Sequence, residues 1–227
     1  MIRPFDLIVF DCDGVLMDSE IVSARVVAED MTEHGIPTTP EQAMARFAGV
    51  SLRTMKPIIE AERGAELPSG WGERMVAKIA TAMAREVTEI PGARAILERL
   101  DALGIPWRIA SNSADAEMDA KFARTGFTVL VRGRTHSAPR LFATGGRPKP
   151  APDVFLDAAR AEGVAPGRCL VIEDSVTGVT GAVAAGMTCY GFLPHGDGAA
   201  LLAAGAARIL RRLDDLAALV APERVGA

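Results

Sequence analysis

Short apolar runs that stop abruptly at a polar residue are the feature that most limits how this chain can fold. The runs cover residues 7–10, 107–110, 169–172 and, more weakly, 188–192. The first three end at Asp11, Ser111 and Glu173. Such runs are typical of strands buried on both faces, as in a parallel sheet covered by helices.

The segments between these runs have the spacing of amphipathic helices. Helices are predicted over residues 93–103, 114–125 and 152–162, and from Ser175 to Gly186. Pro152 suits a first helical turn, Ser175 can cap the last helix, and Gly186 can end it. Alternating strands and helices predict an α/β fold with a Rossmann-like, doubly wound parallel sheet.

Residues 19–89 differ from the rest of the chain because helical periodicity runs through them and no strand is apparent. The expected helices cover residues 21–34, 40–47, 51–62 and 71–87. Pro57 is expected to kink or split the third helix. We predict an α/β core domain of residues 1–17 and 90–227 with an inserted all-helical cap domain, residues 18–89, over the carboxyl edge of the sheet.

Composition excludes several classes of function. The net charge is −4, so no general basic field attracts nucleic acid or an anionic membrane. Arg208, Arg211 and Arg212 are interpreted as a solvated helix end. Three cysteines without a CxxC pair indicate reduced thiols. With no signal peptide or membrane-spanning run expected, we predict a cytoplasmic protein, a monomer or weak dimer, that acts on a small metabolite.

Acidic side chains gather at the predicted strand ends. Asp11 and Asp13 follow the first run, and Glu173 and Asp174 follow the third. In an open α/β sheet these ends line one crevice, where four carboxylates repel one another unless a cation neutralises them. An all-oxygen cluster suits Mg²⁺.

Lys149 lies in the segment GRPKPAP, directly before a predicted helix. The flanking prolines limit the positions that its ammonium group can reach. A fixed cation facing carboxylates and a phosphate can neutralise the charge that develops in phosphoryl transfer.

Four segments together resemble the motifs of the haloacid dehalogenase superfamily. FDCDGVL at residues 10–16 resembles the first motif, and Ser111 with Asn112 the second. Lys149 within KPAPD is similar to the third, and the EDS segment at residues 173–175 to the fourth. The helical insertion is similar to the cap of the subgroup that includes phosphoglycolate phosphatase, β-phosphoglucomutase and sugar-phosphate phosphatases.

This resemblance implies a role for each matching residue. Asp11 attacks phosphorus and becomes an aspartyl-phosphate, and Asp13 protonates the leaving alcohol and later activates water. Ser111, Asn112 and Lys149 hold the phosphoryl oxygens.

The resemblance also implies a Mg²⁺ site. Its ligands are the carboxylates of Asp11 and Asp174 and the backbone carbonyl of Asp13, with Glu173 contacting the ion directly or through water. Gly14 allows the sharp turn that brings both aspartates to one point.

Asp13 favours phosphotransfer over dehalogenation, because an alkoxide leaving group needs a proton and a halide does not. A β-phosphoglucomutase-like phosphomutase is an alternative. The cap histidine and arginine typical of those proteins align with Ser23 and Leu52, although Arg53 is adjacent. A Mg²⁺-dependent phosphatase acting on a sugar phosphate or phosphosugar acid is therefore predicted. A non-catalytic binding protein is a further alternative, disfavoured because Asp11 and Asp13 are both present.

The cap segment around residues 47–56 offers specificity residues, with Ser51 and Arg53 the main candidates. Arg46, Thr54 and Lys56 are close in sequence, and basic groups there would suit an anionic substrate. An equally weighted interpretation makes Ser51 a helix N-cap followed by exposed basic residues.

The remaining candidates receive structural interpretations. His34 is expected at a helix end, His136 and His195 in loops, and Cys12 in apolar packing away from Asp11. The basic stretch at residues 132–147 is interpreted as a mobile loop.

Overall fold

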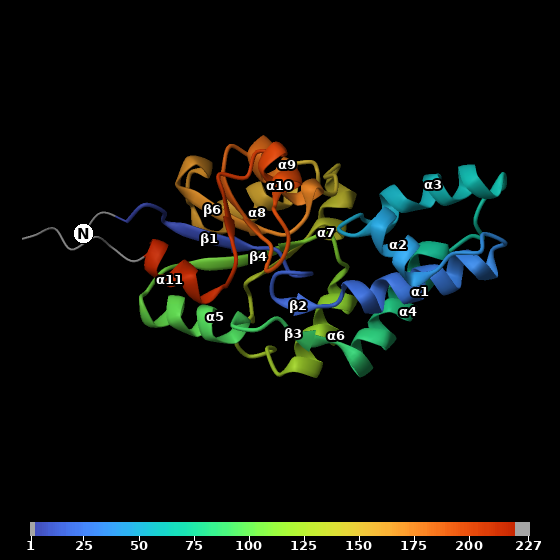
Figure 1. Cartoon of the computed structure of the whole chain (residues 1–227), viewed down its shortest axis with the longest axis horizontal. Coiled ribbons are helices and arrows are strands. Elements are labelled where there is room, and N and C mark those ends of the chain that lie inside the picture. Colours follow the sequence, from blue (N-terminus) through green and yellow to red (C-terminus); the bar gives the residue numbers. More distant parts are fainter. Residues whose placement is uncertain (1–2, 221–227) are drawn as a thin grey trace, which may run out of the picture.

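The computed structural model describes residues 3–220 and contains a six-stranded, fully parallel sheet (Figure 1). Across the sheet the strands follow the order β5 (Thr135–Ser137), β4 (Trp107–Ser111), β1 (Leu7–Phe10), β6 (Cys169–Glu173), β7 (Thr188–Phe192) and β8 (Arg208–Leu210). The four strands with apolar runs are the central ones and lie where the sequence predicted them. The predicted fold class is confirmed.

Helices cover both faces of the sheet (Figure 1). One face carries α8 (Asp153–Glu162), α9 (Val176–Ala184) and α10 (Ala199–Ala203), and the other carries α5 (Ala93–Ala102), α6 (Asp115–Thr125) and α11 (Asp214–Val220). Leu7 and Val9 pack on the first face, while Ile8 and Phe10 pack on the second. Because successive side chains of a strand point to opposite faces, burial on both sides explains why β1 is apolar throughout.

The segment between β1 and α5 forms the helical insertion. It contains α1 (Glu20–Glu33), α2 (Pro40–Phe47), α3 (Leu52–Arg63) and α4 (Trp71–Glu86). Figure 1 shows these helices grouped beyond the carboxyl ends of the strands. A short antiparallel ribbon of β2 (Met17–Asp18) and β3 (Thr88–Glu89) joins the two ends of the insertion, although no strand was predicted there.

Local signals explain where several helices begin. Thr39 accepts a hydrogen bond from Gln42 N and forms a capping box ahead of Pro40. Ser175 caps α9, as predicted, by accepting from Gly178 N at 2.9 Å. Pro57 was expected to kink or split the third helix, and the predicted split is wrong. Helix α3 runs without a break through Pro57, which lies inside it.

Two interpretations of the second half of the chain are also wrong. Arg208 lies in β8, with Arg211 and Arg212 directly after the strand instead of at a helix end. Residues 132–147 contain β5, α7 (Ala138–Leu141) and the 3-10 helix η1 (Phe142–Thr144) instead of a loop. A second 3-10 helix, η2 (Pro166–Arg168), precedes β6.

His136 lies in β5 and not in a loop. Its Nδ1 is 2.6 Å from a carboxylate oxygen of Asp157 on α8. His34, by contrast, is the C-cap of α1, as predicted, and His195 lies exposed between β7 and α10.

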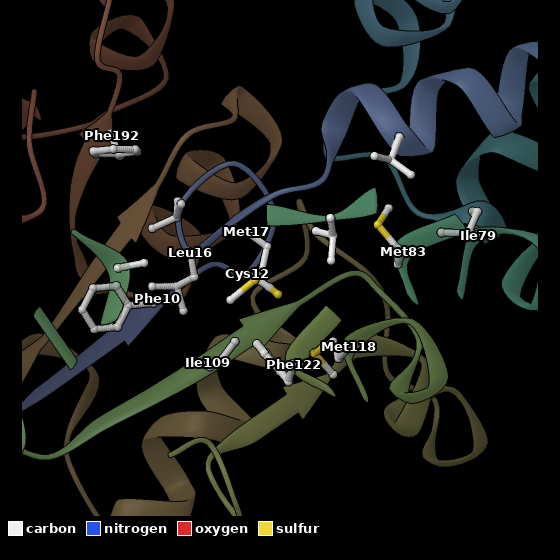
Figure 2. Packing of buried hydrophobic residues seen from close by; sticks show 14 of the residues in the cluster. Phe10, Cys12, Leu16, Met17, Ile79, Met83, Ile109, Met118, Phe122 and Phe192 are labelled. Atoms are coloured by element: carbon white, nitrogen blue, oxygen red, sulfur yellow. The ribbon is translucent and has the colours of Figure 1, made fainter. Parts of the chain in front are cut away.

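One hydrophobic cluster continues from the sheet into the helical insertion (Figure 2). It joins Phe10 of β1, Met17 of the ribbon, Met118 of α6 and Met83 of α4. Cys12 packs in the same cluster, as predicted. Within residues 3–220, no helix has both the length and the apolar character needed to cross a bilayer.

Candidate active site

Three neighbouring strands bring their carboxyl ends together at one edge of the sheet. Strand β1 lies between β4 and β6, and Phe10 is in register with Ile109 and Ile172. Asp11 continues β1, and its backbone N–H donates to Ile172 O at 2.9 Å. Ser111 and Glu173 are the last residues of β4 and β6. Parallel pairing therefore brings residues that are distant in sequence to one crevice, as predicted.

Lys149 is at the centre of this crevice. Its Nζ donates to Asp11 Oδ1 and to Glu173 Oε1, both at 2.6 Å, and to Ala110 O at 2.8 Å. The side chain is 3% exposed. Burial opposes its charged form, but Asp11 and Glu173 outweigh that effect and raise the pKa of Lys149 above its ordinary value. Lys149 is therefore a fixed cation.

Asn112 positions the Lys149 segment. Its Oδ1 accepts from the backbone N–H of Lys149 at 2.9 Å, and its Nδ2 donates to Gly49 O at 3.0 Å. Gly49 belongs to the loop between α2 and α3, so Asn112 also links the crevice to the helical insertion. Sequence reasoning assigned Asn112 to phosphate binding and did not foresee these bonds.

Asp11, Glu173 and Asp174 form a compact acidic cluster. One carboxylate oxygen from each lies within 4.8 Å of the others. Burial, followed by the charge of Glu173, raises the pKa of Asp11 to about 7 although Lys149 opposes the shift. Burial and the neighbouring carboxylates also raise the pKa of Asp174. Lys149 alone does not neutralise this cluster.

The cluster fits a hard divalent cation. Its donor atoms are all oxygens, the ligands that Mg²⁺ prefers, and the carboxylates carry uncompensated charge. The backbone is shaped for close approach, because Gly14 has φ +73° and a Cβ there would lie 1.8 Å from Asp174 Oδ2. Asp11, Glu173 and Asp174 are thus the side chains that could hold such an ion.

Asp13 belongs to a second polar cluster beside the first. Its Oδ2 accepts from Ser113 Oγ at 2.9 Å and from Ser111 Oγ at 3.3 Å. Its Oδ1 accepts from Ser19 Oγ and from Lys121 Nζ. Burial alone would raise the pKa of Asp13, but the charge and hydrogen bond of Lys121, with the hydroxyl bonds, lower it. Asp13 is therefore held by four neighbours.

Sequence reasoning missed three of the groups around Asp13, namely Ser19, Ser113 and Lys121. The ammonium group of Lys121 also donates to Ser113 Oγ at 2.9 Å, and its side chain is 1% exposed. A signal was present in the sequence: Lys121 falls between Met118 and Phe122 on the apolar face of a predicted helix. A lysine at such a position needs a buried partner.

The candidate specificity residues of the insertion have several structural roles. Ser51 caps α3 by accepting from Thr54 N at 3.2 Å, which fits the N-cap interpretation. The guanidinium carbon of Arg53 lies 4.7 Å from the centre of the Phe142 ring. Arg46 pairs with Glu62.

One cavity of about 480 Å³ connects the crevice to the insertion. Asp11, Asp13, Lys149 and Asp174 line one end. Ser23, Ser51, Leu52, Arg53 and Lys56 line it from the insertion. The structure thus brings most of the predicted catalytic and specificity residues to a single space.

Comparison with known proteins identifies the family. The family model described as haloacid dehalogenase-like hydrolase matches residues 5–186. The chain belongs to the haloacid dehalogenase-like hydrolases. It is 31% identical over 193 residues to a 6-phosphogluconate phosphatase of Escherichia coli (strain K12), covering 84% of each chain. The predicted family and the predicted hydrolase class are confirmed.

Solved structures of the same family share the fold of this hydrolase. A conserved haloacid dehalogenase-like protein of unknown function from Agrobacterium tumefaciens is 37% identical, with a TM-score of 0.76 and coverage of 96% of this chain and 98% of that one. A family hydrolase from Deinococcus radiodurans, solved with bound phosphate and sodium, is 34% identical, with a TM-score of 0.72 and coverage of 97% and 99%.

Proposed function

We propose that this hydrolase is a Mg²⁺-dependent phosphatase that cleaves the phosphate monoester of a small metabolite through an aspartyl-phosphate at Asp11. The observation that carries the proposal is the buried contact of Lys149 with both Asp11 and Glu173, next to Asp174. A lysine and a cation site that flank one carboxylate can hold a phosphoryl group against it.

The chemistry follows from the two aspartates. An oxygen of Asp11 bonds to phosphorus while the ester oxygen leaves and takes a proton from Asp13. Water then attacks the aspartyl-phosphate, Asp13 accepts its proton, and inorganic phosphate is released from Asp11. Lys149, Ser111 and Asn112 would steady the phosphoryl oxygens. Bound Mg²⁺ supplies positive charge that offsets the charge of the phosphoryl group and the carboxylates.

Asp13 is positioned for proton transfer, and the donors around it stabilise the carboxylate form that accepts the proton of water. Ser111, Ser113, Ser19 and Lys121 all donate to its carboxylate, so these contacts hold the group in a defined position. Proton transfer by a positioned side chain contributes about 10²–10⁴-fold to such reactions.

A phosphatase is favoured over a phosphomutase by the residues of the insertion. A mutase must grip the second phosphate of a bisphosphate intermediate, and the corresponding positions here are Ser23 and Leu52, neither of which carries charge. Arg53 is adjacent, but its guanidinium group lies over Phe142. The phosphatase names of curated relatives support the same conclusion, and one of them puts 6-phosphogluconate among the substrates to be tested.

Release of phosphate from p-nitrophenyl phosphate tests the proposal. We expect activity with Mg²⁺, loss of activity with a chelator, and none in Asp11→Asn. Asp119→Asn, on the exposed side of α6, is the matched control and should behave as wild type. Turnover that persists in Asp11→Asn would rule out the covalent route.

A further inference from the structure

The cavity extends well beyond the space that a phosphate needs, which bears on the identity of the alcohol that is released. Its volume is about 480 Å³, whereas an apolar cavity of about 150 Å³ accommodates benzene. The part that leads away from Asp11 and Lys149 is surrounded by α1, α2, α3 and α4. We call this part the cap chamber.

Apolar side chains make up most of the walls of the cap chamber, with Ser23, Ser51 and Arg53 among the polar ones. All four helices of the insertion contribute, through Val27, Met44, Phe47, Met55, Val76 and Ile79. Trp71 also faces the cavity, but its indole N–H donates to Asp30 Oδ2 at 2.7 Å. Trp71 itself is only 2% exposed, so it backs the wall as part of the buried core.

Two basic side chains line the chamber, and each has a neighbour within the protein. Lys56 Nζ lies 3.3 Å from Glu60 Oε1, and the guanidinium carbon of Arg53 lies 4.7 Å from the centre of the Phe142 ring. The acidic residues Glu20 and Glu73 line the cavity as well. Carboxylates repel a second anionic group on a substrate, so this wall is poorly suited to a phosphosugar acid or a bisphosphate.

The charge and polarity of the chamber point to an apolar alcohol. A polyhydroxylated sugar would exchange its hydrogen bonds with water for carbon surface, which is unfavourable. An alkyl or aryl group would instead gain from leaving water. We infer that the preferred substrate is a phosphate monoester whose alcohol carries an apolar alkyl or aryl body that fills the cap chamber. This inference rests on the proposed phosphatase function.

A series of n-alkyl phosphates, from ethyl to octyl, tests the inference with wild-type protein and Mg²⁺. Their leaving alcohols have nearly equal basicity, so differences in kcat/KM measure how well the chain is bound. We expect kcat/KM to rise about fourfold per methylene group until the chamber is full. Octyl phosphate should exceed 6-phosphogluconate and glucitol 6-phosphate by at least about 10²-fold.

Two substitutions locate the effect in the chamber. Ala24 and Val27, both on α1, line the cavity. Ala24→Leu should lower the ratio of octyl to ethyl phosphate turnover at least about tenfold, because it fills space. Val27→Ala should move the optimum towards longer chains. Ala61→Leu, on the exposed side of α3, is the matched control and should leave the whole series unchanged.

The outcomes separate this inference from the proposed function. If kcat/KM does not rise along the alkyl series, or if the sugar phosphates turn over faster, the inference is overturned. Phosphate release from p-nitrophenyl phosphate still upholds the proposed phosphatase function in that case. Absence of phosphate release from every ester overturns both. The assignment to the cap chamber is also overturned if kcat/KM rises with chain length equally steeply in wild type, Ala24→Leu and Val27→Ala.

Discussion

Lys121 lies in the interior of the molecule and donates hydrogen bonds to Asp13 and Ser113. We expect Lys121→Met to displace the Asp13 carboxylate and weaken its delivery of a proton to the leaving group. The value of kcat/KM should fall roughly 10²-fold for an alkyl phosphate, which needs that proton. It should fall much less for p-nitrophenyl phosphate, whose leaving group departs without a proton.

Steady-state kinetics with both esters measure this difference. Lys78→Met, which removes a half-exposed lysine of the insertion, is the control and should slow neither ester selectively. Equal losses for both esters in Lys121→Met would show that the lysine has a structural role only. A buried charge pair that loses one partner costs about 3–5 kcal/mol, so thermal unfolding of the variant needs to be recorded in parallel.

Glu117 makes stability depend on pH. Burial is the main cause that raises its pKa from 4.5 to about 7. A carboxyl group whose pKa is raised on folding holds its proton more tightly in the folded state. Its contribution to stability is therefore complete below the unfolded pKa and is lost as pH rises through about 4.5 to 7. Glu117→Gln should therefore raise the free energy of unfolding by up to about 3 kcal/mol at pH 8.

Urea denaturation from pH 5 to pH 8 tests this expectation, since the advantage of Glu117→Gln should shrink steadily towards the acidic end. Glu98→Gln, at an exposed position of α5, should show a difference from wild type that does not vary with pH. A constant advantage for Glu117→Gln would contradict the proposed cause.

The residues at the strand ends could be predicted from sequence, while those around them could not. Asp11, Glu173 and Asp174 stand directly after apolar runs, so their shared location follows from the parallel sheet. Ser113 follows β4 and Lys121 lies on the next helix, α6, so they reach Asp13 through the pairing of β4 with β1 and the path of the chain after it, and no short-range pattern fixes that distance. The same holds for two basic residues near Ser51, because Arg46 pairs with Glu62 of α3 and Arg53 lies over Phe142, contacts that depend on packing between elements.

At the scale of elements, the first turn of α9 shapes the catalytic crevice. A Cβ at Gly178 would lie 1.9 Å from the carboxylate of Glu173, which in turn accepts from Lys149. Gly178→Ala should push Glu173 away from Lys149 and lower kcat/KM about 10²-fold or more, because small misplacements in an active site are costly.

Gly72→Ala is the matched comparison for this helix glycine. A Cβ at Gly72, in α4, meets nothing within 4 Å, so the alanine should raise the free energy of unfolding by about 1 kcal/mol. Measurement of activity and urea stability in both variants separates the steric effect from helix propensity. Wild-type activity in Gly178→Ala would show that the position of Glu173 tolerates this displacement.

The elements that the sequence revealed are those with a strong local signal. Central strands β1, β4 and β6 are buried on both faces and read as apolar runs, whereas the edge strands β5 and β8 are three residues long and include polar side chains. The β2–β3 ribbon has two residues in each strand, too few for any periodicity. These elements are defined by their partners and not by their own composition.

At the scale of the whole molecule, the insertion and the sheet share a hydrophobic cluster. Met83 of α4 and Met118 of α6 belong to the same cluster as Phe10 and Ile109 of the sheet (Figure 2). Burial of one continuous apolar surface favours cooperative unfolding. The division of the chain at residues 18–89 therefore describes topology, and we expect the two parts to unfold together.

The chain has two tryptophans, one in each part: Trp71 in α4 and Trp107 in β4. Trp107→Phe leaves only the probe in the insertion, and Trp71→Phe leaves only the probe in the sheet. Within each variant, the urea midpoint from tryptophan fluorescence should equal the midpoint from far-ultraviolet circular dichroism. Met83→Ala, added to either variant, should lower the free energy of unfolding by about 2–5 kcal/mol and keep the two signals coincident. A Trp71 signal that changes at lower urea than the dichroism would instead show that the insertion unfolds on its own.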